Sequence, residues 1–213
     1  RTKEASQITF TGSTDDLVGE VSRSAPVGQD FTFTLTKDAD YEYTVSAKYT
    51  ESGETVPVTD NGDGTVTYTF KIRSDAKWSD GQPVTANDFV YSWQRLANPL
   101  TAADYCYMID MVKGYDAVAD GSADPSTLGI TAVDDQTLQI DLTYDCPYFE
   151  EIMAFPATFP VRQDMVESSD NWTFDPSTYI GNGPYKMTEW SHNAYISMEK
   201  NENYYDYENL GPD

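Results

Sequence analysis

Long apolar runs and positive charge are both scarce in this sequence. No stretch of about 18 apolar residues occurs, which argues against a membrane-spanning helix in this chain. Lysine and arginine number 13 against 36 aspartate and glutamate residues, so the net charge is −23. A nucleic acid partner is therefore disfavoured, because the phosphates would be repelled. The acidity suits a well-solvated secreted or surface protein.

Catalytic groups are equally few. The single histidine, His192, lies in the segment WSHNAY, whose composition is typical of a turn, so it is a poor candidate for a general base. Neighbouring carboxylates such as Glu150 and Glu151 occur throughout so acidic a chain and do not single out a glycosidase pair. No glycine-rich phosphate loop is present. The sequence therefore gives no support for an enzyme, and no cofactor is expected.

Cysteine is limited to Cys106 and Cys146, which form no metal-binding Cys-x-x-Cys pair. A disulfide between them would close a loop of about 41 residues and stabilise the fold by roughly 4 kcal/mol through chain entropy. Two separate buried thiols are the alternative, and the spacing does not decide between them. Residues 59–64, TDNGDG, lack the closing glutamate of a calcium loop and are better explained as a hairpin turn.

Aromatic and apolar residues are well represented. They make up 14% and 39% of the 213 residues, and 16 residues are tyrosines, so the chain can bury a sizeable core. Apolar and polar residues alternate in several segments, as in half-buried antiparallel strands. This pattern predicts strands over residues 7–11, 17–21, 31–35, 41–49 and 66–72, with turns at 52–54 and 60–64.

The pattern changes at residue 73. The turn-rich segment DAKWSDGQPV precedes a helix that Thr85 can cap, with Asp88 as its capping-box partner and Pro99 just beyond its end. Apolar side chains at helical spacing give this helix one buried face, made of Phe89, Val90, Trp93, Leu96 and Ala97. Further on, the pattern predicts a helix over 103–119, hairpins over 129–142 and 182–201, and short helices over 148–154 and 160–169.

These elements predict an α+β fold in two parts. Residues 1–65 form a strand-rich module, and residues 66–213 form a mixed sheet-and-helix subdomain. The continuous strand TVTYTFKIR at the junction favours close packing of the two parts, because it leaves no flexible linker.

The middle of the chain resembles the solute-binding proteins of bacterial oligopeptide and dipeptide ABC transporters. The similarity begins in TYTFKIRSDAKWSDGQPVTANDFVYSWQRLANPLTAADY and continues through LGITAVDDQTLQIDL, CPYFEEIMAFPATFPV, NGPYKMTEW and EKNENYYD. It covers roughly residues 66–206 in one collinear order. Residues 1–65 instead resemble a bacterial immunoglobulin-like surface module, in the rhythm of GQDFTFTLTKDADYEYTVS followed by NGDGTVTYTF.

This resemblance implies a protein that binds extracellular peptides without transforming them and passes them to a membrane permease. Proteins of this kind are two-lobed clamps that hold the peptide as an extended strand, and residues 66–213 look like part of the first lobe. Within the pattern Thr-Ala-x-x-Tyr, Tyr105 is similar to a tyrosine that lines the peptide cleft. The implied location is extracellular, either anchored at the cell surface or periplasmic.

Two departures from the family leave an alternative open. The family's acidic residue for the peptide amino terminus is not recognisable in residues 1–65, and no second lobe follows within these 213 residues. We therefore expect this chain alone to supply one wall of a cleft, with weak peptide binding or none. The alternative is a surface-exposed interaction or adhesion protein in which the β module and the lobe serve structurally. Among the other tyrosines near the cysteines (Tyr107, Tyr144 and Tyr148) and Phe149, core packing is the default role for each.

Overall fold

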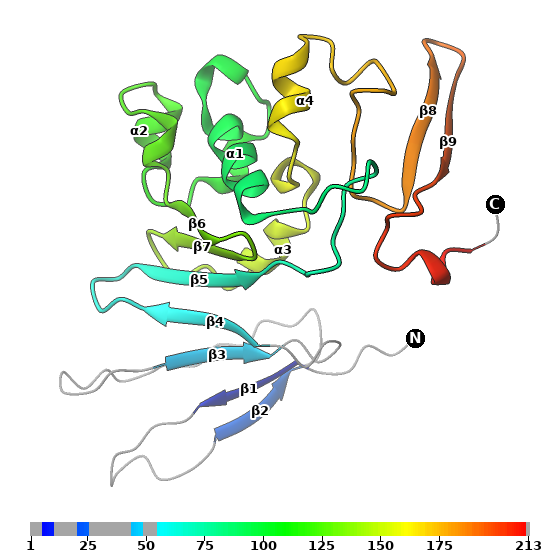
Figure 1. The fold of residues 1–213 in the computed structure, drawn as a ribbon. Helices are drawn as coiled ribbons and strands as arrows, with labels where there is room; N and C mark the ends of the chain where they lie inside the picture. The colour runs from blue at the N-terminus through cyan, green and yellow to red at the C-terminus, as the bar shows by residue number, and fades with distance from the viewer. Residues whose placement is uncertain (1–5, 11–20, 26–43, 49–54, 212–213) are drawn as a thin grey trace, which may run out of the picture.

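The computed structural model describes residues 6–10, 21–25, 44–48 and 55–211 (Figure 1). Both helices and strands are present, which confirms the α+β class. The strands are β1 (Ser6–Phe10), β2 (Val21–Ala25), β3 (Thr44–Lys48), β4 (Thr55–Asp60), β5 (Val66–Lys71), β6 (Ile130–Asp134), β7 (Thr137–Leu142), β8 (Tyr185–Ser191) and β9 (Tyr195–Lys200).

Short helices connect and cover the strands. The α-helices are α1 (Ala86–Ala97), α2 (Tyr115–Ala119), α3 (Phe149–Met153) and α4 (Gln163–Ser168). Single 3-10 turns are η1 (Pro99–Thr101), η2 (Cys106–Ile109), η3 (Pro125–Thr127), η4 (Pro156–Thr158) and η5 (Tyr207–Asn209).

Seven strands form one antiparallel sheet in the order β2-β1-β3-β4-β5-β7-β6. Helices α1, α2 and α4 lie on one side of its β5-β7-β6 end, and β8 and β9 pair as a separate hairpin (Figure 1). Strand β4 pairs with β5, with Val58 opposite Tyr68. The sheet thus runs across the junction at residue 65, while the two-part domain division stays a prediction.

Most strand predictions that fall on described residues are confirmed. Strands β1, β3 and β5 lie where alternation predicted them, and residues 61–65 form the turn between β4 and β5. In that turn Asp60 Oδ1 accepts from the Gly62 N–H, and Asp63 Oδ1 accepts from the Thr65 N–H. The predicted strand over 31–35, most of that over 17–21 and the turn at 52–54 lie outside the described residues.

The hairpin of β6 and β7 supplies the floor of the core. Leu138, Ile140 and Leu142 alternate on one face of β7 and are buried, as their spacing predicted. Asp134 forms the turn, since its carboxylate accepts hydrogen bonds from the Gln136 N–H at 2.8 Å and from the Thr137 hydroxyl at 2.8 Å. The predicted hairpin over 129–142 is therefore confirmed.

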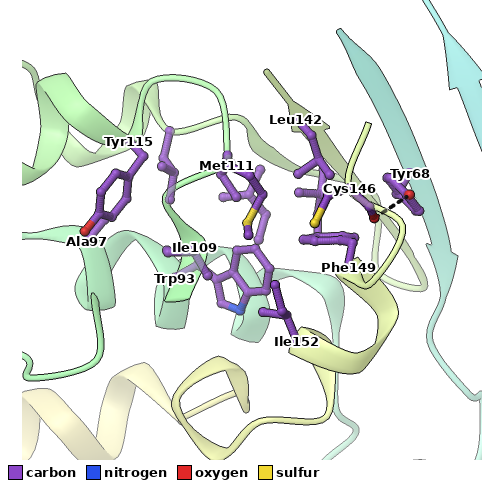
Figure 2. Close-up of a cluster of buried hydrophobic side chains, with 14 of the residues drawn as sticks. Tyr68, Trp93, Ala97, Ile109, Met111, Tyr115, Leu142, Cys146, Phe149 and Ile152 are labelled. Atoms are coloured by element: carbon purple, nitrogen blue, oxygen red, sulfur yellow. Dashed lines mark hydrogen bonds between the residues drawn. The ribbon is translucent and has the colours of Figure 1, made fainter. Parts of the chain in front are cut away.

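Helix α1 begins and ends as its sequence predicts. The Asp88 carboxylate accepts from the Thr85 N–H at 2.7 Å and from the Thr85 hydroxyl at 3.0 Å, which caps the first turn. Its buried face carries Trp93, which packs edge-on to Phe149 with ring centroids 6.3 Å apart. Figure 2 shows this cluster, in which the Tyr68 hydroxyl also donates to the Cys146 carbonyl at 3.3 Å. The helix thus closes the core from above the sheet.

The helix predicted over 103–119 is wrong as a single element. It is divided into η2 and α2, with residues 111–113 extended along the end of β7. The Lys113 N–H donates to the Asp141 carbonyl at 2.9 Å, and the Thr143 N–H donates to the Met111 carbonyl at 2.9 Å. Gly114 then takes a φ of +83°, which starts α2 in a new direction. Sheet pairing here outweighs helical periodicity.

The Trp-Ser-Asp-Gly turn connects three distant segments. Its own bend is closed by the Gly81 N–H donating to the Trp78 carbonyl at 2.8 Å, with Gly81 at a φ of +88°. The Ser79 N–H donates to the Gly181 carbonyl at 2.8 Å, and the Ser79 carbonyl accepts from Asn203 Nδ2 at 3.1 Å. The turn therefore holds both ends of the segment that contains the β8–β9 hairpin.

An ion pair joins the same turn to α4. Arg162 Nη1 lies 2.9 Å from Asp80 Oδ2, and the rest of the guanidinium makes two hydrogen bonds to Asp164, at 2.8 and 2.5 Å. The Arg162 side chain is only 13% exposed. Its hydrogen bonds hold the pKa of the Asp164 carboxyl below its ordinary value.

This pair gives a pH-dependent stability prediction. The pKa of Asp164 in the folded chain is lowered below its ordinary value of 3.8. The Arg162–Asp164 pair therefore stabilises the fold above pH 3.8, and this stabilisation is lost as the pH falls through the pKa of the folded chain. We expect Arg162→Gln to lower the unfolding free energy by about 1 kcal/mol at neutral pH, and the difference from the parent chain to shrink below pH 3.8 in urea titrations. Arg95→Gln, at a site without an ion pair among the described residues, is the control. If the difference in unfolding free energy between Arg162→Gln and the parent chain stayed constant from neutral pH to below pH 3.8, the prediction would be wrong.

Candidate functional site

Three aromatic side chains form an exposed surface beside α1, which we call the aromatic wall: Tyr105, Tyr107 and Phe155. The Tyr105 ring lies 5.4 Å from the Phe155 ring and 6.1 Å from the Tyr107 ring, measured between centroids. Tyr105 is 52% exposed and Tyr107 is 56% exposed, whereas Phe155 is half-buried. Exposed rings in contact with one another offer flat apolar faces, and the two hydroxyls can donate or accept hydrogen bonds.

The backbone before Tyr105 is constrained on both sides of η1. The Asn98 side chain accepts from the Leu100 N–H at 3.0 Å, which ends α1 and starts the 3-10 turn. Ala102 then adopts a left-handed conformation, with a φ of +50°. A residue with a β-carbon is strained there by roughly 1 kcal/mol. The chain thus reverses sharply just before the residue that the sequence singled out.

The other side of the wall is carried by η4. Phe155 comes directly before Pro156, where α3 has ended and the chain turns back toward α1. Its contact with Tyr105 joins residues 50 positions apart, so the pattern along the sequence did not identify it. The one local signal is the Phe-Pro step, which places an aromatic side chain at the end of an element.

The remaining aromatics near the cysteines divide between core and surface. Phe149 is fully buried, as expected for core packing, whereas Tyr144 and Tyr148 are about half exposed. Cys106 and Cys146 are free thiols in the structure, the first half-buried and the second buried. Burial raises the pKa of the Cys146 thiol. Cys106, between Tyr105 and Tyr107 in sequence, packs against the buried core.

Other groups considered from the sequence lie elsewhere. His192 occupies the turn between β8 and β9, as predicted, and its ring lies against Trp190 with centroids 4.3 Å apart and planes tilted by 31°. Among the described residues, no cluster of histidine, cysteine, aspartate and glutamate is arranged to hold a metal ion. Over the same part of the chain, no helix has the length and apolar character needed to cross a membrane.

Comparison with known proteins points to one family. Residues 58–212 match the family model described as bacterial extracellular solute-binding proteins, family 5 Middle. The chain is 39% identical over 140 residues to the dipeptide-binding protein DppE of Bacillus subtilis, covering 66% of this chain and 26% of that protein. It is 42% identical over 142 residues to the periplasmic oligopeptide-binding protein OppA of Salmonella typhimurium, covering 65% and 26%.

Solved structures agree with this assignment. The substrate-binding domain of an oligopeptide ABC transporter from Bacillus anthracis aligns with a TM-score of 0.66 and 38% identity, covering 76% of this chain and 32% of that one. Listeria monocytogenes OppA bound to peptide aligns with a TM-score of 0.66 and 38% identity, covering 71% and 30%. The predicted resemblance is confirmed and extends to residue 58, inside β4. The chain spans about a quarter of the length of the curated relatives that it matches.

Proposed function

Since the chain belongs to the family 5 bacterial extracellular solute-binding proteins, we propose that it forms part of the peptide-binding component of an ABC transporter. It would bind oligopeptides outside the cytoplasm, anchored at the cell surface or in the periplasm, and act with a membrane permease. Its role would be binding rather than catalysis. The observation that carries the proposal is the aromatic wall around Tyr105, on a chain whose relatives are named for dipeptide and oligopeptide binding.

The chemistry of the wall suits an extended peptide. Apolar side chains of a peptide can pack on the exposed faces of Tyr105 and Tyr107, and the hydroxyls can pair with peptide N–H or C=O groups. The two rings contact each other, and Tyr105 also contacts Phe155, so neighbouring side chains already orient the surface. A preformed surface lowers the ordering cost of binding. The wall would supply one side of the cleft.

Calorimetry with a mixed pool of oligopeptides tests this proposal. We expect Tyr105→Ala to weaken binding by about 5- to 30-fold, because an aromatic contact of roughly 1–2 kcal/mol is lost. Tyr195→Ala is the matched control, since Tyr195 is 51% exposed but lies on the separate β8–β9 hairpin. Equal affinities for Tyr105→Ala and the parent chain would rule out the wall as the binding surface.

A second candidate is a surface-exposed interaction or adhesion protein without transport activity. Strands β1, β2 and β3 favour it, because they lie outside the residues that match the family and yet extend the same sheet. Absence of heat with every class of peptide in the same calorimetric series would support this candidate over peptide transport.

A further inference from the structure

Two neighbouring side chains of helix α1 hold the loop that carries Phe155, one of the three residues of the aromatic wall. The Ser92 hydroxyl donates to the Phe159 carbonyl at 2.7 Å, and Trp93 Nε1 donates to the Thr158 carbonyl at 2.9 Å. Both α1 side chains are buried, and Trp93 is fully so. Figure 2 shows the Trp93 indole beside Ile152 of α3 within the core. Two consecutive carbonyls of the loop are therefore fixed to a rigid helix.

Thr158 passes this constraint to Phe155. Its side chain is completely buried, and its hydroxyl lies 2.8 Å from the Phe155 carbonyl, closer than to the carbonyls of Ile152 and Met153 at 3.1 and 3.2 Å. The Thr158 N–H also donates to the Phe155 carbonyl, at 2.9 Å, so both groups of Thr158 bind the residue that precedes η4. Trp93 binds the backbone of Thr158, and Thr158 binds the backbone of Phe155.

Phe155 in turn supports Tyr105. The two rings are in contact at 5.4 Å, tilted by 60°. Because Tyr105 is exposed on its other side, its ring direction depends on the neighbours that it touches, Phe155 and Tyr107. A rotation of η4 relative to α1 would move the Phe155 ring and release Tyr105.

We infer that Trp93 is a positioning residue for peptide binding. Its indole N–H, acting through Thr158, fixes the Phe155 ring on which Tyr105 lies, although Trp93 itself is too deeply buried to touch a peptide. The inference rests on the proposed function for its binding readout. This role differs from core packing alone. Packing depends on the volume of the indole ring, whereas positioning depends on the hydrogen bond that its N–H donates to Thr158.

A double-mutant cycle separates these roles. Trp93→Phe keeps an aromatic ring but removes the N–H and part of the indole, so a core truncation elsewhere is needed for comparison. We expect about fivefold weaker binding of the oligopeptide pool by calorimetry. In a Phe155→Leu background the same change should alter the dissociation constant by less than about twofold. Without the Phe155 ring, the hydrogen bond of Trp93 no longer affects Tyr105. Val118→Ala, a core change in α2, should leave the dissociation constant unchanged. The inference would be overturned if Trp93→Phe weakened binding equally in both backgrounds, or if Val118→Ala weakened binding as much as Trp93→Phe.

A second readout works without peptide. Fluorine NMR of 3-fluorotyrosine at position 105 reports the surroundings of that ring in the unbound chain. We expect Trp93→Phe to shift or broaden the resonance and Val118→Ala to leave it unchanged. An unchanged resonance in Trp93→Phe would overturn the positioning role. Failure of the parent chain to bind any peptide would instead defeat the proposed function, and the fluorine signal would still decide the role of Trp93.

Discussion

Phe149→Ala is expected to lower the free energy of unfolding by about 3–5 kcal/mol. Phe149 is fully buried and its ring contacts Tyr68 of β5 at 4.8 Å, Phe70 at 6.3 Å and Trp93 of α1 at 6.3 Å. It is therefore the side chain of α3 that joins the sheet to the covering helix. Truncation removes all three ring contacts and leaves a cavity that backbone relaxation can fill only in part.

Urea denaturation followed by circular dichroism measures this loss. Phe174→Ala is the matched control, since it removes the same atoms from a ring that is 49% exposed beside Trp190. We expect this control to lose less than about 1 kcal/mol. If the two variants were destabilised equally, Phe149 would not be the junction of the core.

Gly114→Ala is expected to destabilise the chain by about 2–4 kcal/mol, which combines a left-handed backbone with a steric overlap. The φ of Gly114 is +83°, and a β-carbon added there would lie 2.9 Å from the Thr127 carbonyl oxygen, a backbone atom. That backbone continues into β6, so it cannot yield without disturbing the sheet. Relief would require α2 to move away from the η3 segment.

Gly62→Ala separates the two contributions. Gly62 has a similar φ of +79°, but nothing lies within 4 Å of an added β-carbon. We expect it to lose only the conformational part, about 1 kcal/mol. The difference between the two variants in urea titrations measures the steric part. No difference would mean that the Thr127 backbone adapts freely.

Local patterns were sufficient for the elements that carry their own signals. The alternation of Leu138, Ile140 and Leu142 predicted both β7 and its buried face, because a strand has a period of two. Thr85 and Asp88 predicted the first turn of α1, because a capping box is local. The short helices α3 and α4 lie within the predicted ranges 148–154 and 160–169.

Contacts between distant segments could not be predicted in this way. Residues 103–119 have helical spacing, yet residues 111–113 pair with the end of β7, which follows about 30 positions later. The aromatic wall is similar in this respect. Tyr105 came from family resemblance, whereas its support by Phe155, and the support of Phe155 by Trp93, depend on how η4 packs against α1.

The Trp-Ser-Asp-Gly turn controls the local unfolding of the β8–β9 hairpin. One residue, Ser79, uses both its backbone groups on residues that flank the β8–β9 hairpin, Gly181 and Asn203. Breaking the bend at Gly81 would break both hydrogen bonds of Ser79 together. The two ends of the hairpin segment would therefore not detach from the turn one after the other. Loss of the bend and release of the hairpin should therefore be a single cooperative event, with one common opening free energy.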